Sequence, residues 1–198
     1  MDVITIETLW AALLGFALGS VPFGLLLTKA AGLGDVRDIG SGSIGATNVL
    51  RTGNKGLAAA TVLLDAAKGA VPVVIAAQLW AGTEGVAAVA AVAGHCFTPW
   101  LKFRGGKGFA TAAGVLLALA WPIMLICAGI WALTLAISRI SSVSSMTTVV
   151  LASVAAWAMG RGELIWPLVA IAAIVLIQHR ANIGRLLRGE EPKIGSSK

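Results

Sequence analysis

The first segment whose residue types could do chemistry runs from Asp38 to Arg51 and reads DIGSGSIGATNVLR. Its three glycines and two serines would let backbone N–H groups converge on an anion, with Arg51 available to clamp it. Residues 40–45 match G-x-G-x-x-G, but no strand precedes them and no βαβ unit is available, so a dinucleotide site is rejected. The plainer alternative is a flexible polar loop, which would not need Thr47, Asn48 and Arg51.

A second glycine-rich segment spans residues 94–108 and reads GHCFTPWLKFRGGKG. A Walker motif would need glycine where Leu101 stands and serine or threonine where Gly108 stands, so ATP hydrolysis is unsupported. A glycine-rich turn that opens onto a helix beside Lys107 nevertheless favours a phosphate, because free N–H groups and the helix dipole both attract anions. The alternative is a basic loop that meets anionic lipid head groups.

The third segment spans residues 178–192 and reads QHRANIGRLLRGEEP. At helical spacing, His179, Asn182 and Arg185 share a face and could meet one ligand. The sequence has two histidines, His95 and His179, and either could titrate near neutrality and act as a base or hydrogen-bond donor. Taken alone, the segment could equally be an amphipathic tail lying on a membrane.

These segments belong to an unusually apolar chain. Of its 198 residues, 58% are hydrophobic and 12% are charged, and the mean hydropathy is +0.89. A soluble fold of this size could not hide so much apolar surface, which excludes cytosolic enzymes, disordered chains, coiled coils and secreted modules. The formal net charge of +6 is then first an orientation signal and only second a hint of anionic ligands, and it does not indicate nucleic acid.

Apolar runs long enough to cross a membrane identify the elements that must position the three segments. The fourth run exceeds the roughly 20 residues that one span needs, and Trp121-Pro122 interrupts it. If two short helices turn at that point, every basic residue except Lys68 and Arg161 falls on one face, as the positive-inside rule requires. The runs cover residues 9–31, 56–80, 85–101, 109–137, 143–159 and 164–177.

The sequence therefore predicts an all-α polytopic membrane protein with seven transmembrane helices, an outside N-terminus, a cytoplasmic C-terminus and a single domain, residues 1–198. Two features interrupt the apolar interior. The GSVPFG stretch at residues 19–24 breaks the first helix, and Asp65 with Lys68 places two ionisable groups one turn apart in the second. Charges inside a membrane are functional by default, but a local pair that neutralises itself is an equally good interpretation.

Three anion-binding loops on one face suggest a substrate with several phosphate groups, or two phosphorylated substrates. No cluster of acids, cysteines and histidines has the spacing of a metal site, so no metal and no cofactor are expected. No Ser-His-Asp or Cys-His pairing is evident either. An enzyme of this kind would take an already activated substrate and contribute positioning and electrostatics.

Together with GSVPFG, the three segments resemble the bacterial acyl-phosphate:glycerol-3-phosphate acyltransferase family, in order and at the expected spacing over nearly the whole chain. The resemblance implies a multi-pass enzyme of the cell (inner) membrane with its active site at the cytoplasmic face. It would move a fatty acyl group from acyl phosphate to the 1-hydroxyl of sn-glycerol 3-phosphate, giving lysophosphatidic acid and phosphate in the first acylation of phospholipid synthesis. A functional link to an enzyme that produces acyl phosphate is also implied.

The same resemblance assigns roles to residues of this sequence. Catalysis would rest on His179, Ser41 and Asn182, with either His179 or a phosphate oxygen of the substrate as the general base. These three residues would also bind the two substrates at the edge of the membrane lipid. The other substrate-binding residues would be Gly42, Thr47, Asn48, Arg51, Gly105, Gly106, Lys107 and Gly108.

Two alternatives remain at the level of sequence. A transporter or channel for a small phosphorylated anion could use the same basic loops. Several broken helices and an internal repeat would be evidence for that class. The sequence shows only the break at residues 19–24 and no internal repeat. A thioester-using acyltransferase would carry His-x4-Asp. The corresponding positions hold Trp100 after His95 and Gly184 after His179, which argues against that class.

Overall fold

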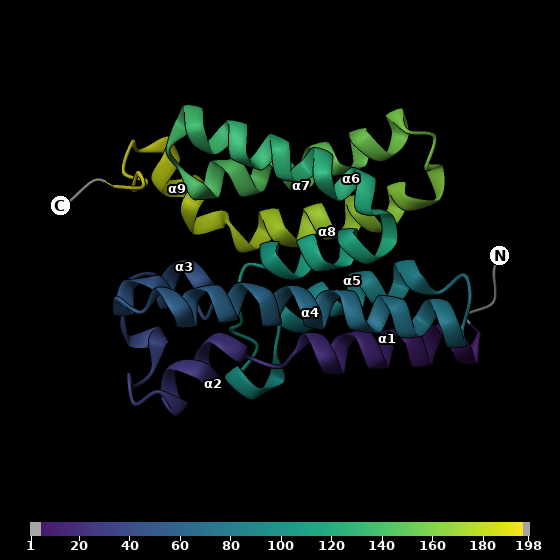
Figure 1. Cartoon of the computed structure of the whole chain (residues 1–198), viewed down its shortest axis with the longest axis horizontal. Coiled ribbons are helices and arrows are strands. Elements are labelled where there is room, and N and C mark those ends of the chain that lie inside the picture. Colours follow the sequence, from purple (N-terminus) through teal and green to yellow (C-terminus); the bar gives the residue numbers. More distant parts are fainter. Residues whose placement is uncertain (1–4, 196–198) are drawn as a thin grey trace.

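The computed structural model describes residues 5–195, and within that range the chain is entirely helical apart from turns and loops (Figure 1). The predicted all-α class is therefore confirmed. Residues 1–4 and Lys198, which enter the predicted orientation, lie outside the described residues. The α-helices are α1 (Ile6–Gly19), α2 (Phe23–Ala30), α3 (Ala46–Val49), α4 (Lys55–Leu79), α5 (Glu84–Cys96), α6 (Phe109–Ser138), α7 (Ser141–Ala158), α8 (Ile165–Gln178) and α9 (Arg180–Leu187). Four 3-10 turns join them: η1 (Val36–Asp38), η2 (Leu50–Thr52), η3 (Pro99–Leu101) and η4 (Gly162–Leu164).

The first apolar run is broken between α1 and α2, where the sequence predicts a break. Pro22 has no N–H to donate, so the helical hydrogen bonds cannot continue through it. The backbone freed at the break is bound by distant side chains: Thr98 Oγ1 donates to the Ser20 carbonyl at 2.7 Å, and Lys68 Nζ donates to the Val21 carbonyl at 2.7 Å. The break is thus built into the bundle.

Helix α6 is also interrupted, beside the predicted turn. Ala120 has φ −162° and ψ 83°, which are not helical, and Pro122 follows two residues later. Pro122 cannot donate a backbone hydrogen bond and its ring would clash with the preceding helical turn, so an uninterrupted helix through this point is disfavoured and Pro122 falls in the first turn of the second half. In Figure 1 the teal first half of α6 runs away from the end that carries α9, and the greener second half runs back toward it.

Four helical segments of the described chain are long and apolar enough to cross a membrane, and a fifth is added if the bent pair of α8 and α9 counts as one span. Helix α5 has only 13 residues, about 20 Å at 1.5 Å per residue, and is shorter than the hydrocarbon layer. A count of seven requires α5 and both halves of α6 to be spans. The helical membrane architecture is shown, and the number seven stays a prediction.

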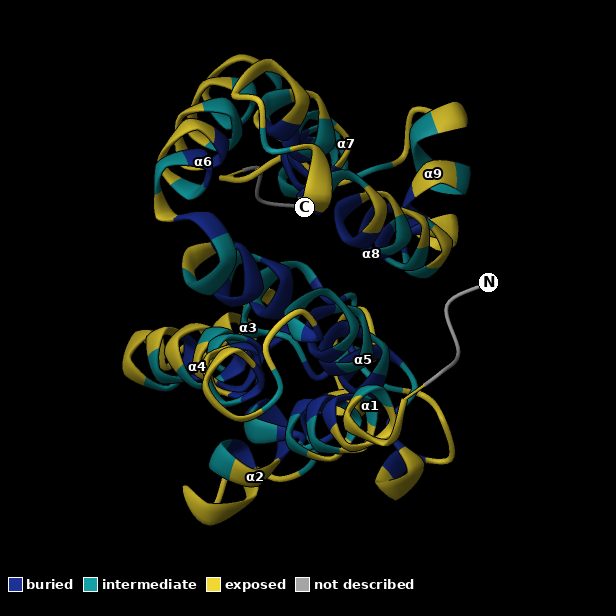
Figure 2. Ribbon diagram, turned by 90° about the vertical axis from the view of Figure 1, so that its right-hand side faces the viewer, coloured by how far each residue is buried: buried dark blue, intermediate teal, exposed yellow. Residues whose placement is uncertain are grey.

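The long helices lie side by side, with buried inner faces and exposed outer faces (Figure 2). Large apolar side chains cover the outer faces, among them Leu63 at 70% and Ile137 at 77% exposure, as expected for surfaces in contact with lipid. Glycines bring helices together inside. A Cβ on Gly69 of α4 would collide with the Thr111 carbonyl of α6, and one on Gly114 of α6 would collide with the Ala66 carbonyl of α4.

This close approach makes a stability prediction. A Gly114→Val variant should lose about 1–3 kcal/mol, the cost typical of an overpacked interior, because the new side chain forces α4 and α6 apart. Gly129→Val is the matched control on the same helix, since a Cβ at Gly129 meets no atom within 4 Å. Thermal unfolding in detergent measures both variants. Equal melting temperatures for the two would contradict a packing role for Gly114.

Candidate active site

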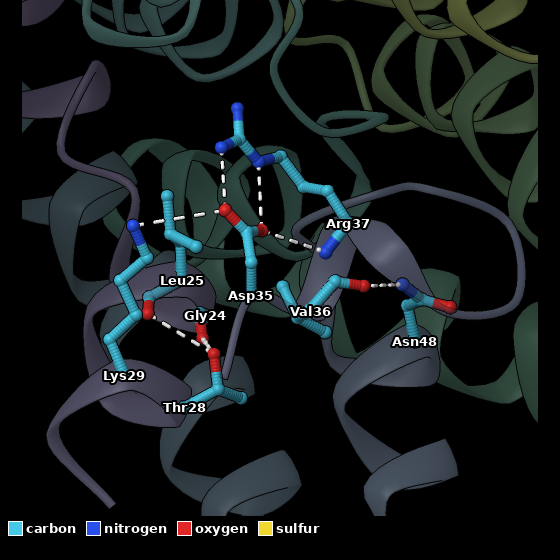
Figure 3. A network of polar contacts seen from close by, with 8 residues as sticks. All are labelled: Gly24, Leu25, Thr28, Lys29, Asp35, Val36, Arg37 and Asn48. Atoms are coloured by element: carbon cyan, nitrogen blue, oxygen red, sulfur yellow. Dashed lines mark hydrogen bonds and ion pairs between the residues drawn. The ribbon is translucent and has the colours of Figure 1, made fainter. Parts of the chain in front are cut away.

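The long loop between α2 and α4 is organised by Asn48 in the short helix α3. Its side chain is 2% exposed, and its amide Nδ2 donates to the Val36 carbonyl at 2.6 Å (Figure 3). The same Nδ2 donates to the carbonyls of Ser43 at 2.8 Å and Ile39 at 3.1 Å. Its Oδ1 accepts the Ser41 N–H at 3.1 Å. Both amide hydrogens are engaged by the loop. In this geometry Asn48 shapes the loop and turns its amide away from a ligand.

Around that amide, the loop presents its other predicted ligand-binding residues at the surface. Ser41, Gly42 and Thr47 are all exposed. Arg51, in η2, lies over Gly40: a Cβ on Gly40 would collide with the Arg51 guanidinium and approach Asn48 Oδ1. Gly40 also has φ +54°, a conformation that favours glycine. Gly40 was not among the predicted site residues, although it fixes where Arg51 sits.

The GGKG loop is packed directly onto the end of α5. The Gly105 N–H donates to the Cys96 carbonyl at 3.0 Å, and the Gly106 N–H donates to the His95 carbonyl at 3.1 Å. A Cβ on Gly106 would collide with the His95 ring. These two glycines are therefore required for close packing, and their N–H groups are already used.

The N–H groups of this loop that remain available to bind an anion are therefore those at the start of α6. Gly108, at φ +85°, is the N-cap of α6, and a Cβ added there would lie 3.0 Å from Cys96 Sγ and 3.0 Å from Val92 Cγ1. Within residues 5–195, the N–H groups of Lys107 and Gly108 donate no hydrogen bond. They stand at the positive end of a helix dipole, beside the Lys107 ammonium.

His179 lies at the bend of 61° between the α8 segment and α9. It is 3% exposed, and its Nδ1 lies 2.8 Å from the Val175 carbonyl. A carbonyl oxygen only accepts, so Nδ1 carries the hydrogen of the neutral ring, and Nε2 keeps a lone pair. That arrangement leaves Nε2 as the nitrogen able to take a proton.

Glu191 folds back from the tail and joins α7 to α9. Its carboxylate, on a side chain 6% exposed, accepts from Ser142 Oγ at 2.6 Å, Asn182 Nδ2 at 2.5 Å and Arg185 Nε at 2.7 Å. Burial alone would raise the pKa of Glu191, but these hydrogen bonds outweigh it and hold the pKa below its ordinary value. Asn182 Oδ1 is buried without a hydrogen-bond partner in the described structure and remains able to accept one from a ligand.

The three segments meet at Lys107. The pKa of this lysine is lowered, first by burial and then by the positive charges of Arg185 and Arg51, while the negative charge of Glu191 opposes the shift. One residue thus feels charges from the first loop, the third segment and the tail. Figure 1 shows α3 and α9 at the same end of the molecule. The charges of Arg51 and Arg185 thus act on Lys107, and the Glu191 carboxylate joins Asn182 and Arg185 to Ser142. That these residues bind substrate stays a prediction.

The charged residues inside the bundle pair with one another. Lys68 Nζ lies 2.7 Å from Asp65 Oδ1, with both side chains 3% exposed, and His95 Nδ1 lies 3.7 Å from the same oxygen. Lys68 also donates to the Val21 carbonyl at the helix break. The self-neutralising interpretation of Asp65 and Lys68 fits these contacts, which connect α4, α5 and the first span.

Glu191 gives a prediction with a defined pH dependence. Replacing it with glutamine should cost about 1.5–3 kcal/mol near neutral pH, the range for a hydrogen bond to a charged group. Because the folded pKa is depressed, the carboxylate stabilises the protein above the ordinary pKa of 4.5, and this contribution is lost as pH falls through the lower folded value. Thermal unfolding against pH should show the two proteins converging in acid.

The control for that experiment is Glu190→Gln. Glu190 pairs with Arg188 at 2.7 Å, but both side chains are more than half exposed, so its loss should change stability by at most about 1 kcal/mol. A Glu191→Gln effect that is equally small, or that persists unchanged below the pKa of a free carboxyl group, would argue against the hydrogen-bonded carboxylate.

The fold is that of an all-helical membrane protein. Its candidate site combines three cationic side chains, a buried histidine with a free ring nitrogen and a carboxamide, which is typical of membrane proteins that handle phosphorylated substrates. A family model described as glycerol-3-phosphate acyltransferase matches residues 9–189. The chain belongs to the glycerol-3-phosphate acyltransferase family. The predicted enzyme of phospholipid synthesis is therefore confirmed, and the transporter alternative is not favoured.

Individual relatives and solved structures agree with that assignment. The glycerol-3-phosphate acyltransferase of Erythrobacter litoralis is 61% identical over 186 residues, covering 94% of each chain. That of Mesorhizobium japonicum is 52% identical over 193 residues, covering 98% of this chain and 99% of its own. The glycerol 3-phosphate form of PlsY (YgiH), an integral membrane glycerol 3-phosphate acyltransferase, has a TM-score of 0.89 at 32% identity, covering 95% of this chain and 96% of that one. Its lysophosphatidic acid form has a TM-score of 0.88 at 31% identity, covering 95% of both chains.

Proposed function

We propose that the chain transfers a fatty acyl group from acyl phosphate to the 1-hydroxyl of sn-glycerol 3-phosphate. The observation that carries this proposal is that Lys107 lies within the electrostatic influence of Arg51 and Arg185 and itself influences His179, whose Nδ1 is bound to the Val175 carbonyl so that Nε2 is left free. Crystal structures of a similar protein in its glycerol 3-phosphate and lysophosphatidic acid forms support the acceptor and the product.

The reaction needs no covalent intermediate, because acyl phosphate is a mixed anhydride and already activated. The 1-hydroxyl oxygen attacks the acyl carbonyl carbon, the bond from that carbon to the phosphate oxygen breaks, and phosphate leaves with the bonding electrons. His179 Nε2 takes the hydroxyl proton. A phosphate oxygen of the substrate is the alternative acceptor of that proton.

The side chains divide between the two phosphates. Arg51 and Lys107 neutralise the phosphate of glycerol 3-phosphate, with Ser41 at the mouth of the loop, while Asn182 Oδ1 accepts from a glycerol hydroxyl. The N–H groups of Lys107 and Gly108 at the start of α6 face the acyl phosphate head. Its apolar chain lies between the helices, in contact with membrane lipid.

We also propose the finer topology: seven transmembrane helices in one domain of residues 1–198, with the N-terminus outside and the C-terminus in the cytoplasm. The turn at Ala120 supports it, because only that turn brings Arg139 and the basic tail to the same side as Arg51 and Lys107. In a bacterial inner membrane, this orientation opens the active site to cytoplasmic glycerol 3-phosphate. It also faces the enzyme that supplies acyl phosphate.

One assay tests the reaction directly. Purified protein in detergent should release phosphate from palmitoyl phosphate only when glycerol 3-phosphate is present, with lysophosphatidic acid formed in equal amount. Palmitoyl-CoA is the comparison donor and should give no product. Absence of phosphate release above background would refute acyl phosphate as the donor, and acylation from palmitoyl-CoA would point to the thioester-using class.

A further inference from the structure

A cavity separate from the candidate active site opens between α2 and η3. Its volume is about 760 Å³, large enough for a ligand of substantial size. The active-site residues Arg51, Lys107 and His179 do not line it. Four basic residues do, two from each side: Lys29 of α2 and Arg37 of η1 on one side, and Lys102 and Arg104, which follow η3, on the other.

The rim of this cavity carries a surplus of positive charge. Asp35 accepts from Arg37 Nε at 2.9 Å and Nη2 at 2.6 Å, and lies 3.7 Å from Lys29 Nζ (Figure 3). The single Asp35 carboxylate thus neutralises only part of the charge of Lys29 and Arg37. On the opposite side, neither Lys102 nor Arg104 forms an ion pair with any described residue. The cavity therefore attracts an anion, and chiefly toward the η3 side.

Apolar residues form the part of the cavity lining between the basic residues, and two of them are exposed at the protein surface. Leu26 of α2 is 49% exposed and Trp100 of η3 is 71% exposed. The Trp100 indole N–H donates to Ser20 Oγ at 2.9 Å, which fixes the ring beside the break in the first span. Tryptophan with one polar edge and an exposed apolar face is typical of the membrane–water boundary.

We propose that this cavity binds an anionic phospholipid. Its phosphate lies between Lys102, Arg104 and the cations of the α2 side, and one acyl chain follows Leu26 and Trp100 into the bilayer. The combination of an unneutralised cationic rim with an apolar, lipid-exposed wall matches both parts of such a molecule. A soluble phosphorylated metabolite would leave the apolar wall bare, and an uncharged lipid would leave the cations unpaired.

The bound lipid fastens the first loop of the active site. Arg37 belongs to η1, and the carbonyl of its neighbour Val36 accepts the hydrogen bond of 2.6 Å from Asn48. Asn48 in turn holds the Ser41 N–H at 3.1 Å. Figure 3 shows this row of contacts from Lys29 and Asp35 through Val36 to Asn48. A lipid phosphate on Arg37 therefore restrains the segment that positions Ser41, and anionic lipid should raise the rate of acyl transfer.

Lipid retention tests the site without requiring turnover. The full chain is placed in nanodiscs of phosphatidylcholine alone or with phosphatidylglycerol, phosphatidic acid or lysophosphatidic acid, extracted into neutral detergent, and examined by native mass spectrometry. The wild type should retain anionic lipid. In the double variant Lys102→Gln/Arg104→Gln the affinity should fall by roughly 30-fold, about fivefold for each basic residue removed. Comparing phosphatidylglycerol, a phosphodiester, with phosphatidic acid and lysophosphatidic acid, which are phosphomonoesters, identifies which head group the cavity binds.

Lys55→Gln/Arg188→Gln is the matched control, because it removes the same charge from exposed positions away from the cavity. It should retain lipid like the wild type. Equal lipid retention by the two double variants would overturn the proposal. This includes the case in which both variants lose lipid to the same extent, because the effect would then come from net charge and not from the cavity. A Lys102→Gln/Arg104→Gln variant that retains lipid normally but no longer binds an acidic soluble protein would also overturn the proposal, because the basic residues would then bind protein and not lipid. Unfolding temperatures verify that both variants fold.

Activity gives the second readout. Phosphatidylglycerol should raise the wild-type rate several-fold, and the Lys102→Gln/Arg104→Gln variant should keep the basal rate in phosphatidylcholine but not respond. A wild type that retains lipid without any rise in rate would overturn the link to the first loop. Failure of the proposed acyl transfer would instead appear as no turnover in any lipid, with lipid retention intact.

Discussion

A His179→Gln variant is expected to lose two to four orders of magnitude in kcat, about the range that a positioned general base supplies, with a much smaller change in KM for glycerol 3-phosphate. The reason is the fixed tautomer. The Val175 carbonyl, 2.8 Å from Nδ1, leaves the lone pair on Nε2, and glutamine offers no nitrogen that can accept a proton. Steady-state phosphate release with both substrates varied separates kcat from KM.

Arg180→Gln is the control for this experiment, since Arg180 is the adjacent residue, is exposed, and donates only to the Ile177 carbonyl at 3.3 Å. It should behave like the wild type. A His179→Gln enzyme with near-normal maximal rate would exclude the histidine as base. The proton would then pass to a phosphate oxygen of the substrate, and the effect of His179 on the reaction would be confined to binding.

The turn inside the longest apolar run was the most informative prediction of the fold. The apolar run of residues 109–137 is longer than one span needs, and its length alone leaves open whether it is one kinked helix or two. The position of Pro122 and the distribution of basic residues indicated two helices, and Ala120 is indeed non-helical. The sequence predicts this turn because the number of membrane crossings decides on which side every later basic residue lies. The length of one apolar run carries no such information.

The site was predictable as a set of segments and less so as a set of contacts. Glycine and basic residues identified Arg51, Lys107, His179 and Asn182, and the structure brings them together. The same patterns could not tell that Asn48 turns inward to the loop carbonyls. An exposed and a buried asparagine have the same sequence signal, and only the folded loop decides where the amide hydrogen bonds go.

Two further features depended on contacts between distant segments. The N–H groups of Gly105 and Gly106 bind carbonyls at the end of α5, so glycine there reflects packing more than anion binding. Glu191 bridges Ser142 and Asn182 across 49 and 9 residues of sequence. The only hint of it was an acidic pair within a basic tail, which gives no partner. Long-range polar contacts of this kind leave no periodic pattern for sequence analysis to detect.

A Lys107→Met variant is expected to raise KM for glycerol 3-phosphate by roughly 10- to 150-fold with a smaller effect on kcat. A charge-assisted hydrogen bond contributes about 1.5–3 kcal/mol, and each 1.4 kcal/mol is about a factor of ten in affinity. The phosphate of the acceptor is the same before and during acyl transfer, so the lost interaction is one of uniform binding. Initial rates over a range of glycerol 3-phosphate concentrations give both constants.

The pH dependence of the wild type gives the same group a second signature. Burial and the charges of Arg185 and Arg51 lower the pKa of Lys107, so the ammonium loses its proton at a lower pH than a free lysine does, and KM should rise as pH increases through that value. Lys107→Arg keeps its charge to higher pH and should move this rise upward, while Lys55→Met, an exposed change outside the site, should leave the profile intact. An alkaline profile identical in wild type and Lys107→Arg would assign the titration to another group, and a KM unchanged in Lys107→Met would remove this lysine from the phosphate site.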